Sequence, residues 1–192
     1  MAKPIEVTVI EKVFDFVVHT FPKELKKASK EFKKSDEAEA AKDERTYERG
    51  LLSWFLLERK TNLGLTPMEL AYLCPLDCFT NRDRRIIKNF IEHTISLFEV
   101  KKIHNKDYLL ENVIDKKEHL VNTIDFPDIV KEGEFIRALI VKKLEGGYFF
   151  HGNVLTYTKQ DGLEIRDFLL KNIKKIKKRK KPKIEWEIRY KK

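Results

Sequence analysis

The residues best suited to binding a polyanion lie near the end of the chain. Lysine and arginine side chains that neutralise phosphates release counterions, and the resulting affinity depends on salt rather than on base sequence. Between positions 171 and 183 there are nine basic residues and no acidic one: Lys171, Lys174, Lys175, Lys177, Lys178, Arg179, Lys180, Lys181 and Lys183. This basic run predicts contact with a nucleic acid, RNA slightly ahead of DNA, or with an acidic protein surface. A solvated tail is the alternative.

The distribution of charge supports this placement. The formal net charge is +9; residues 161–192 hold 13 basic and five acidic residues, which leaves the rest of the chain at +1. Such asymmetry is typical of a chain whose basic end meets a polyanion. A membrane surface fits less well, because the apolar residues of this segment lack Trp and suit the protein's own core. We predict no membrane partner.

Aromatic side chains offer a second kind of contact. Tyr148 and Phe150 share one face of a strand pattern, and Phe149 lies on the other face. Bases of single-stranded nucleic acids stack on such rings, so Tyr148 and Phe150 are candidates for stacking. One face of the strand has to enter a core, which is the competing role for these rings.

Cysteine and histidine predict little chemistry. Cys74 and Cys78 form C-P-L-D-C, but zinc sites commonly join such a pair to a second pair of ligands, and the sequence has no second Cys pair and no H-x₃₋₅-H. We therefore predict two thiols packed between helices and no metal site. His151, between Phe150 and Gly152, is predicted to be a hydrogen-bonded residue at the rim of a sheet.

Known catalytic and cofactor motifs do not occur. There is no Walker A loop, no G-x-S-x-G and no H-E-x-x-H, and glycine accounts for only seven of 192 residues. The sequence predicts no catalytic residue and no cofactor. It leans against an enzyme without deciding the matter, because folding could still bring a Cys–His or carboxylate pair together.

Hydrophobic periodicity predicts an α+β protein whose residues 1–94 are helical. Thr66-Pro67-Met68-Glu69 has the composition of a capping box, and Thr80 begins a further helix. The expected helices run from Ile5 to Thr20, from Pro22 to about Lys34, from Asp36 to about Lys60, from Pro67 to Cys74, and from Thr80 to about His93.

Residues 95–160 predict a small β-barrel of the SH3-like or OB-like kind, two classes that the sequence does not separate. Five short runs of β-branched and aromatic residues lie between Ser96 and Tyr157, and Gly146-Gly147 suits a two-residue hairpin turn. Residues 161–192 are expected to form a basic helix, from about Leu163 to Arg179, and a final strand, Ile184–Tyr190. Both would pack on the barrel, which would then have five to six strands.

Composition bears on habitat and compartment. The start of the chain has no signal-peptide pattern, and no apolar run is long enough to span a bilayer. Two cysteines do not make a disulfide framework, so a cytoplasmic protein is expected. Charged residues make up 37% of the chain, with few Cys and Met, which is typical of a thermophile.

Three stretches, between Glu48 and Gly152, occur in a suggestive order: E-R-G-L-L-S-W-F-L-L-E-R, G-L-T-P-M-E-L-A-Y-L, and S-L-F-E-V-K-K-I followed by G-G-Y-F-F-H-G. This order resembles a loosely related group of uncharacterised prokaryotic proteins, with a W-F helix, a T-P-x-E helix start and a small β module opening S-x-F-E-V. Some of them are associated with a Cys-rich zinc motif at the C-terminus, which this chain lacks. The resemblance implies the domain organisation and no activity.

The sequence as a whole favours non-catalytic, largely sequence-nonspecific nucleic-acid binding through the basic C-terminal segment. The alternative is a protein-interaction or scaffold module whose working surface is the helical half and the final strand. The sequence leaves the oligomeric state open.

Overall fold

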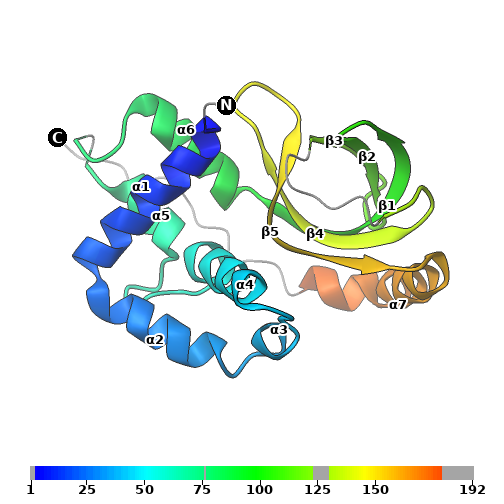
Figure 1. Ribbon diagram of the computed structural model, residues 1–192, viewed down its shortest axis with the longest axis horizontal. Coiled ribbons are helices and arrows are strands. Elements are labelled where there is room, and N and C mark those ends of the chain that lie inside the picture. Colours follow the sequence, from blue (N-terminus) through cyan, green and yellow to red (C-terminus); the bar gives the residue numbers. More distant parts are fainter. Residues whose placement is uncertain (1–2, 76, 123–129, 179–192) are drawn as a thin grey trace.

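The computed structural model describes residues 3–75, 77–122 and 130–178, and only the backbone of residues 173–178. Within these residues the protein is α+β: helices fill the first half, a five-stranded sheet follows, and one long helix packs against the sheet (Figure 1). The helices of the first half are α1 (Ile5–Thr20), α2 (Pro22–Phe32), α3 (Asp36–Glu39), α4 (Glu44–Leu57), α5 (Pro67–Leu73) and α6 (Asn81–Ile91). None of the described helices is long and apolar enough to cross a membrane.

Side-chain caps set several of the helix starts. Thr66 and Thr80 each complete a reciprocal capping box, with Glu69 and Asp83 respectively, as the sequence predicts for Thr66. The single helix expected from Asp36 to about Lys60 is wrong. The chain leaves the helical conformation after Glu39, and α4 begins after Asp43, whose carboxylate accepts the Thr46 N–H at 2.7 Å. This cap divides the expected helix into α3 and α4.

The sheet contains β1 (Thr94–His104), β2 (Asp107–Asn112), β3 (Glu118–Asn122), β4 (Phe135–Lys142) and β5 (Tyr148–Tyr157). The hydrogen-bonded order β1-β2-β3-β5-β4 closes on itself, because β1 also pairs with β4. All neighbours are antiparallel except β3 and β5, where the last two residues of β3 pair in parallel with the first two of β5. Gly146 and Gly147 both have positive φ, as predicted, but the connection between β4 and β5 is the longer loop 143–147.

Three hydrophobic clusters hold these elements together. The largest joins the helices to the outer side of β4 and β5, where Leu139, Val141 and Phe149 meet α6. The second fills the inside of the sheet, around Phe98 and Tyr108. The third lies under the last helix. The helical half and the sheet therefore share one packed boundary rather than meeting only through the chain.

Candidate nucleic-acid interface

The last helix, α7 (Lys159–Lys178), carries the first part of the predicted basic run. It begins four residues before the expected Leu163, because the Thr158 hydroxyl accepts the Asp161 N–H at 3.2 Å and donates to the Asp161 carboxylate at 2.7 Å. Gly162, which lies just before the expected helix start, is buried inside the helix. The Thr158 cap therefore moves the start of α7 onto the end of β5.

Close packing fixes the first half of α7 on the barrel. A Cβ atom at Gly162 would lie 2.1 Å from Cδ2 of Phe135, so only glycine allows the helix to come this near. Leu163, Ile165 and Leu169 then pack against the buried cluster that includes Phe135. The helix axis is therefore set by apolar contacts that involve none of its lysines.

Charge changes sign along the same helix. Residues 159–168 contain two basic and three acidic residues, whereas residues 169–178 contain five lysines and no acid. Arg166 is held by Asp167, and Lys171 is exposed. The backbone positions of Lys174, Lys175, Lys177 and Lys178 continue the helix. Arg179, Lys180, Lys181 and Lys183, and the predicted strand Ile184–Tyr190, lie outside the described residues.

An exposed aromatic ring accompanies these lysines. The pattern of apolar residues places Phe168 on the inner side of the helix, yet 65% of Phe168 is exposed. It lies one turn before Lys171, so the two residues share a face of α7. A solvent-facing phenyl ring beside ammonium groups is a combination that single-stranded nucleic acids bind.

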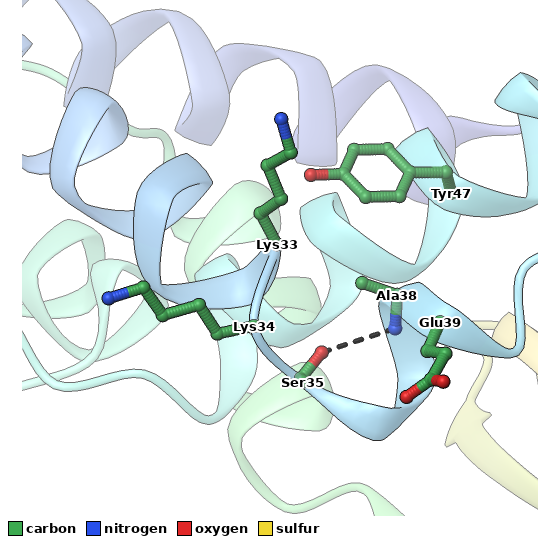
Figure 2. A pocket seen from close by; sticks show the side chains of 6 residues that line it. All are labelled: Lys33, Lys34, Ser35, Ala38, Glu39 and Tyr47. Carbon is green, nitrogen blue, oxygen red and sulfur yellow. Dashed lines mark hydrogen bonds between the residues drawn. The ribbon is translucent and has the colours of Figure 1, made fainter.

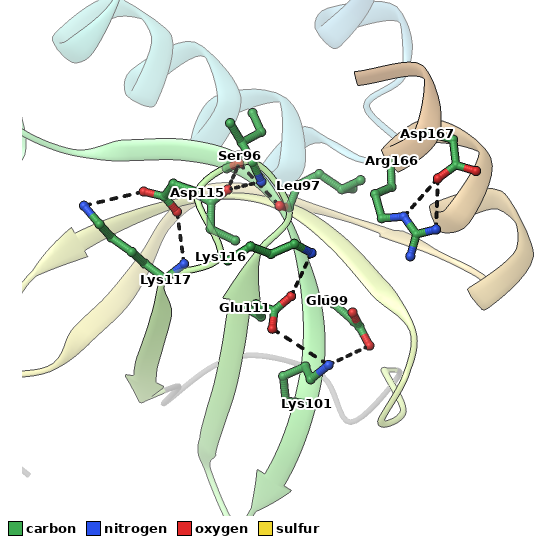
Figure 3. A network of polar contacts seen from close by, with 12 residues as sticks. Ser96, Leu97, Glu99, Lys101, Glu111, Asp115, Lys116, Lys117, Arg166 and Asp167 are labelled. Atoms are coloured by element: carbon green, nitrogen blue, oxygen red, sulfur yellow. Dashed lines mark hydrogen bonds and ion pairs between the residues drawn. The ribbon is translucent and has the colours of Figure 1, made fainter. Parts of the chain in front are cut away.

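Three lysines on β1 and in the turn after β2, Lys101, Lys116 and Lys117, are paired with acids. Lys101 lies 3.1 Å from Glu99 and 4.0 Å from Glu111, which also binds Lys116 at 3.0 Å (Figure 3). The hydrogen bond that Lys101 donates to Glu99 is the main cause that raises the pKa of Lys101. The outer face of β1 and β2 therefore does not extend the positive charge of α7.

The rings predicted to stack are turned largely into the core. Tyr148 packs edge-to-face against His119 with centroids 4.8 Å apart, and Phe150 lies 6.3 Å from Tyr108. Phe149, on the opposite face, packs against Phe90 at 5.7 Å. Both faces of this strand segment are thus in use. Stacking by Tyr148 and Phe150 stays a prediction, and their packing against core residues counts against it.

His151 does not lie at a hydrogen-bonded rim in the way that the sequence suggests. Its ring packs edge-to-face on Phe90 at 5.3 Å, and its buried Nε2 has no hydrogen-bond partner among the described residues. Burial, reinforced by the positive charges of His93 and Arg49, lowers the pKa of His151 to about 4. Gly152, at φ +72°, allows the backbone beside it to approach Ser53 of α4.

The two cysteines lie close together, with Cys74 half-buried and Cys78 exposed. Burial, together with a hydrogen bond to Cys78, raises the pKa of Cys74 to about 11. Among the described residues no group of three or more His, Cys, Asp or Glu side chains is placed to hold a metal ion. Cys74 therefore has the character of a packed thiol rather than of an activated nucleophile. The expected packing of Cys78 between helices is wrong, because Cys78 is exposed.

A hollow of about 410 Å³ opens where α2, α3 and α4 meet. Figure 2 shows its lining: Lys33, Lys34, Ser35, Ala38, Glu39 and Tyr47. It is wide and open to solvent, and the Ser35 hydroxyl is already taken up in capping α3. The Glu39 carboxylate on its wall opposes an anionic ligand, so we assign no site to the hollow itself.

No protein-family model, no curated protein and no solved structure matches the chain. The resemblance inferred from the order of sequence motifs thus stays a prediction.

Proposed function

We propose that the protein binds nucleic acid without catalysis and largely without sequence preference, through the second half of α7 and the basic residues that follow it. The observation that carries the proposal is the separation of roles along one helix. Apolar side chains of the first half anchor α7 on the barrel, and the second half adds five lysines without an acid. Lysines on an anchored helix contact phosphates with less loss of freedom than lysines on a free tail.

Single strands, and RNA among them, are the favoured ligand. The exposed Phe168 supports this choice, because base stacking on an aromatic ring contributes about 1–3 kcal/mol per base and needs an unpaired strand. We also propose that the barrel is OB-like rather than SH3-like. The strand order, with β1 between β2 and β4 and with β3 parallel to β5, supports a Greek-key barrel.

Salt dependence tests the proposal. Binding of a single-stranded U20 RNA should give a log–log slope of about −3 to −4 if five phosphates are neutralised. Lys174→Gln/Lys175→Gln/Lys178→Gln should make this slope about 2 units shallower. The matched control is Lys101→Gln/Lys116→Gln/Lys117→Gln, which removes equal charge from lysines that already face Glu99, Glu111 and Asp115. A wild-type log–log slope near zero would refute the proposal.

A protein-interaction module is the second candidate, and the same Phe168 gives it support. An exposed phenyl ring is also suited to an apolar contact with a protein, and Leu170 on the same helix is 39% exposed. Phe168→Ala separates the two functions. It should weaken binding of U20 at least fivefold and leave duplex DNA binding unchanged if bases stack on the ring. Unchanged U20 binding would favour the protein-interaction module.

A further inference from the structure

A second lysine surface lies on α2, far from α7 in the sequence. Its members are all exposed: Lys23, Lys26, Lys27, Lys30, Lys33 and Lys34. At 3.6 residues per turn, the four that lie within the helix fall in an arc of about 100°. Ala28 and Phe32, on the opposite side, are buried in the protein. The outer face of α2 is therefore a continuous lysine face.

The acids of α2 do not cancel this charge. The helix contains two, Glu24 and Glu31, and both are bound by Arg59 from the segment after α4. Arg59 donates to Glu24 at 2.8 Å and to Glu31 at 2.6 and 3.1 Å. One lysine, Lys27, shares Glu24 at 3.3 Å. Within the described residues, the other five lysines of the face have no ion pair.

We propose that the lysine face of α2 is a second phosphate-binding surface, and that its ligand is the backbone of a nucleic acid. The inference rests on the proposed function for the class of partner, but its residues are separate. From Lys23 to Lys34 the face extends about 16 Å, a length comparable to about five base-pair steps. Ammonium groups bind phosphates as point charges, so this contact is independent of sequence.

The packing of α2 argues against a membrane surface as the ligand. A helix that binds in the interface of a bilayer inserts an apolar face, and the apolar face of α2 is already buried against the helical core. Phe32, for example, is 1% exposed and packs on Tyr47 and Trp54. What the helix offers to a partner is charge alone.

The two basic surfaces are separate. In Figure 1, α2 and α7 lie along the same edge of the molecule with the short α3 between them. Asp36, Glu37 and Glu39 of α3 are exposed acids. They would repel a strand that ran directly from one surface to the other. We therefore expect the contributions of α2 and α7 to the salt slope to add.

The experiment uses the full chain and U20 RNA with three equal-charge variants. Lys23→Gln/Lys30→Gln/Lys34→Gln tests α2, the Lys174/Lys175/Lys178 variant tests α7, and the Lys101/Lys116/Lys117 variant is the control. We expect the α2 variant to make the log–log slope shallower by about 2 units, and the control to change it by less than 1. Because the three α2 lysines are exposed, the melting temperature should not change. The charge-retaining variant Lys23→Arg/Lys30→Arg/Lys34→Arg should bind as the wild type does.

The outcomes distinguish the two proposals. An unchanged slope in the α2 variant overturns the inference about α2, while the α7 variant decides the proposed function by itself. If the log–log slope becomes shallower in the α2 variant but not in the α7 variant, the inference is supported and the role of α7 is refuted. Loss of binding in the arginine variant, or loss of binding to phosphatidylserine vesicles but not to U20, overturns the assignment of α2 to nucleic acid. A wild type without salt-dependent binding overturns both.

Discussion

Replacing Arg59 by methionine should destabilise the protein, because Arg59 neutralises a buried carboxylate. The Arg59 side chain is 8% exposed and that of Glu24 is 6% exposed, whereas Glu31 is 53% exposed. The exposed pair with Glu31 contributes at most about 1 kcal/mol. Removing one partner of a buried pair costs about 3–5 kcal/mol, because it leaves an uncompensated charge. Lys27 still forms an ion pair with Glu24 after the change. We therefore expect the free energy of unfolding to fall by about 2–4 kcal/mol.

The destabilisation caused by Arg59→Met should decrease as the pH is lowered. The hydrogen bonds from Arg59 are the main cause that holds the pKa values of Glu24 and Glu31 below 4.5. A carboxyl whose folded pKa is depressed stabilises the fold above its unfolded pKa, and this contribution is lost as the pH falls through the folded pKa. The free energy of unfolding should therefore differ most between wild type and Arg59→Met at pH 7, and this difference should shrink below pH 4.5.

Urea unfolding followed by circular dichroism measures this difference at each pH. The control is the double variant Arg59→Met/Glu24→Gln, in which a neutral amide replaces the stranded carboxylate. It should recover at least half of the loss at pH 7. The reasoning is refuted if Arg59→Met costs less than about 1 kcal/mol at pH 7, if the cost persists unchanged as the carboxyls protonate, or if the double variant is no more stable than the single one.

Three further predictions concern other sites. Gly162→Ala should destabilise the protein by about 1–2 kcal/mol in urea unfolding, because the clash with Phe135 outweighs the helix propensity of alanine; a net gain would show that α7 shifts freely. Iodoacetamide at pH 8 should alkylate Cys78 well before Cys74, whose raised pKa leaves little thiolate, and mass spectrometry of a time course would reveal the opposite order. Lowering the pH from 7 to 5 should reduce the free energy of unfolding by about 2 kcal/mol through His151, because the unfolded histidine binds a proton that the folded one excludes. In urea unfolding, His151→Phe should remove this part of the pH dependence.

Local signals predicted most of the helices and strands. The capping box at Thr66 lies within four residues of sequence, and the structure forms it as expected. The cap at Asp43 was missed because residues 36–49 are rich in charge and lack an apolar period that would mark a helix boundary. The early start of α7 was missed because Gly162 is typical of a turn in sequence, and only the nearby Phe135 ring explains a glycine inside the helix.

The candidate site was less predictable than the fold, because it depends on which face of a helix is docked. Leu163, Ile165, Phe168 and Leu169 are all apolar, and they cover more of α7 than one packing face can bury. Contact with the barrel takes three of them and leaves Phe168 in solvent. Sequence spacing alone does not select this orientation, since it follows from the approach of Gly162 to a residue 27 positions earlier.

The local charge at α2 likewise follows from the structure and not from the net charge of the sequence. The first 160 residues are nearly neutral in sum, yet the sum hides a separation between the lysine face of α2 and six exposed acids between positions 36 and 48. Lys23 lies about 14 Å along the helix axis from the end where α3 follows. At physiological ionic strength, salt largely screens exposed charges that are more than about 8 Å apart, so these acids do little to cancel the field at Lys23. A ligand responds to that local field, and Arg59 strengthens it by pairing with both acids of α2. Loss of Arg59 should therefore weaken binding at α2 as well as the fold.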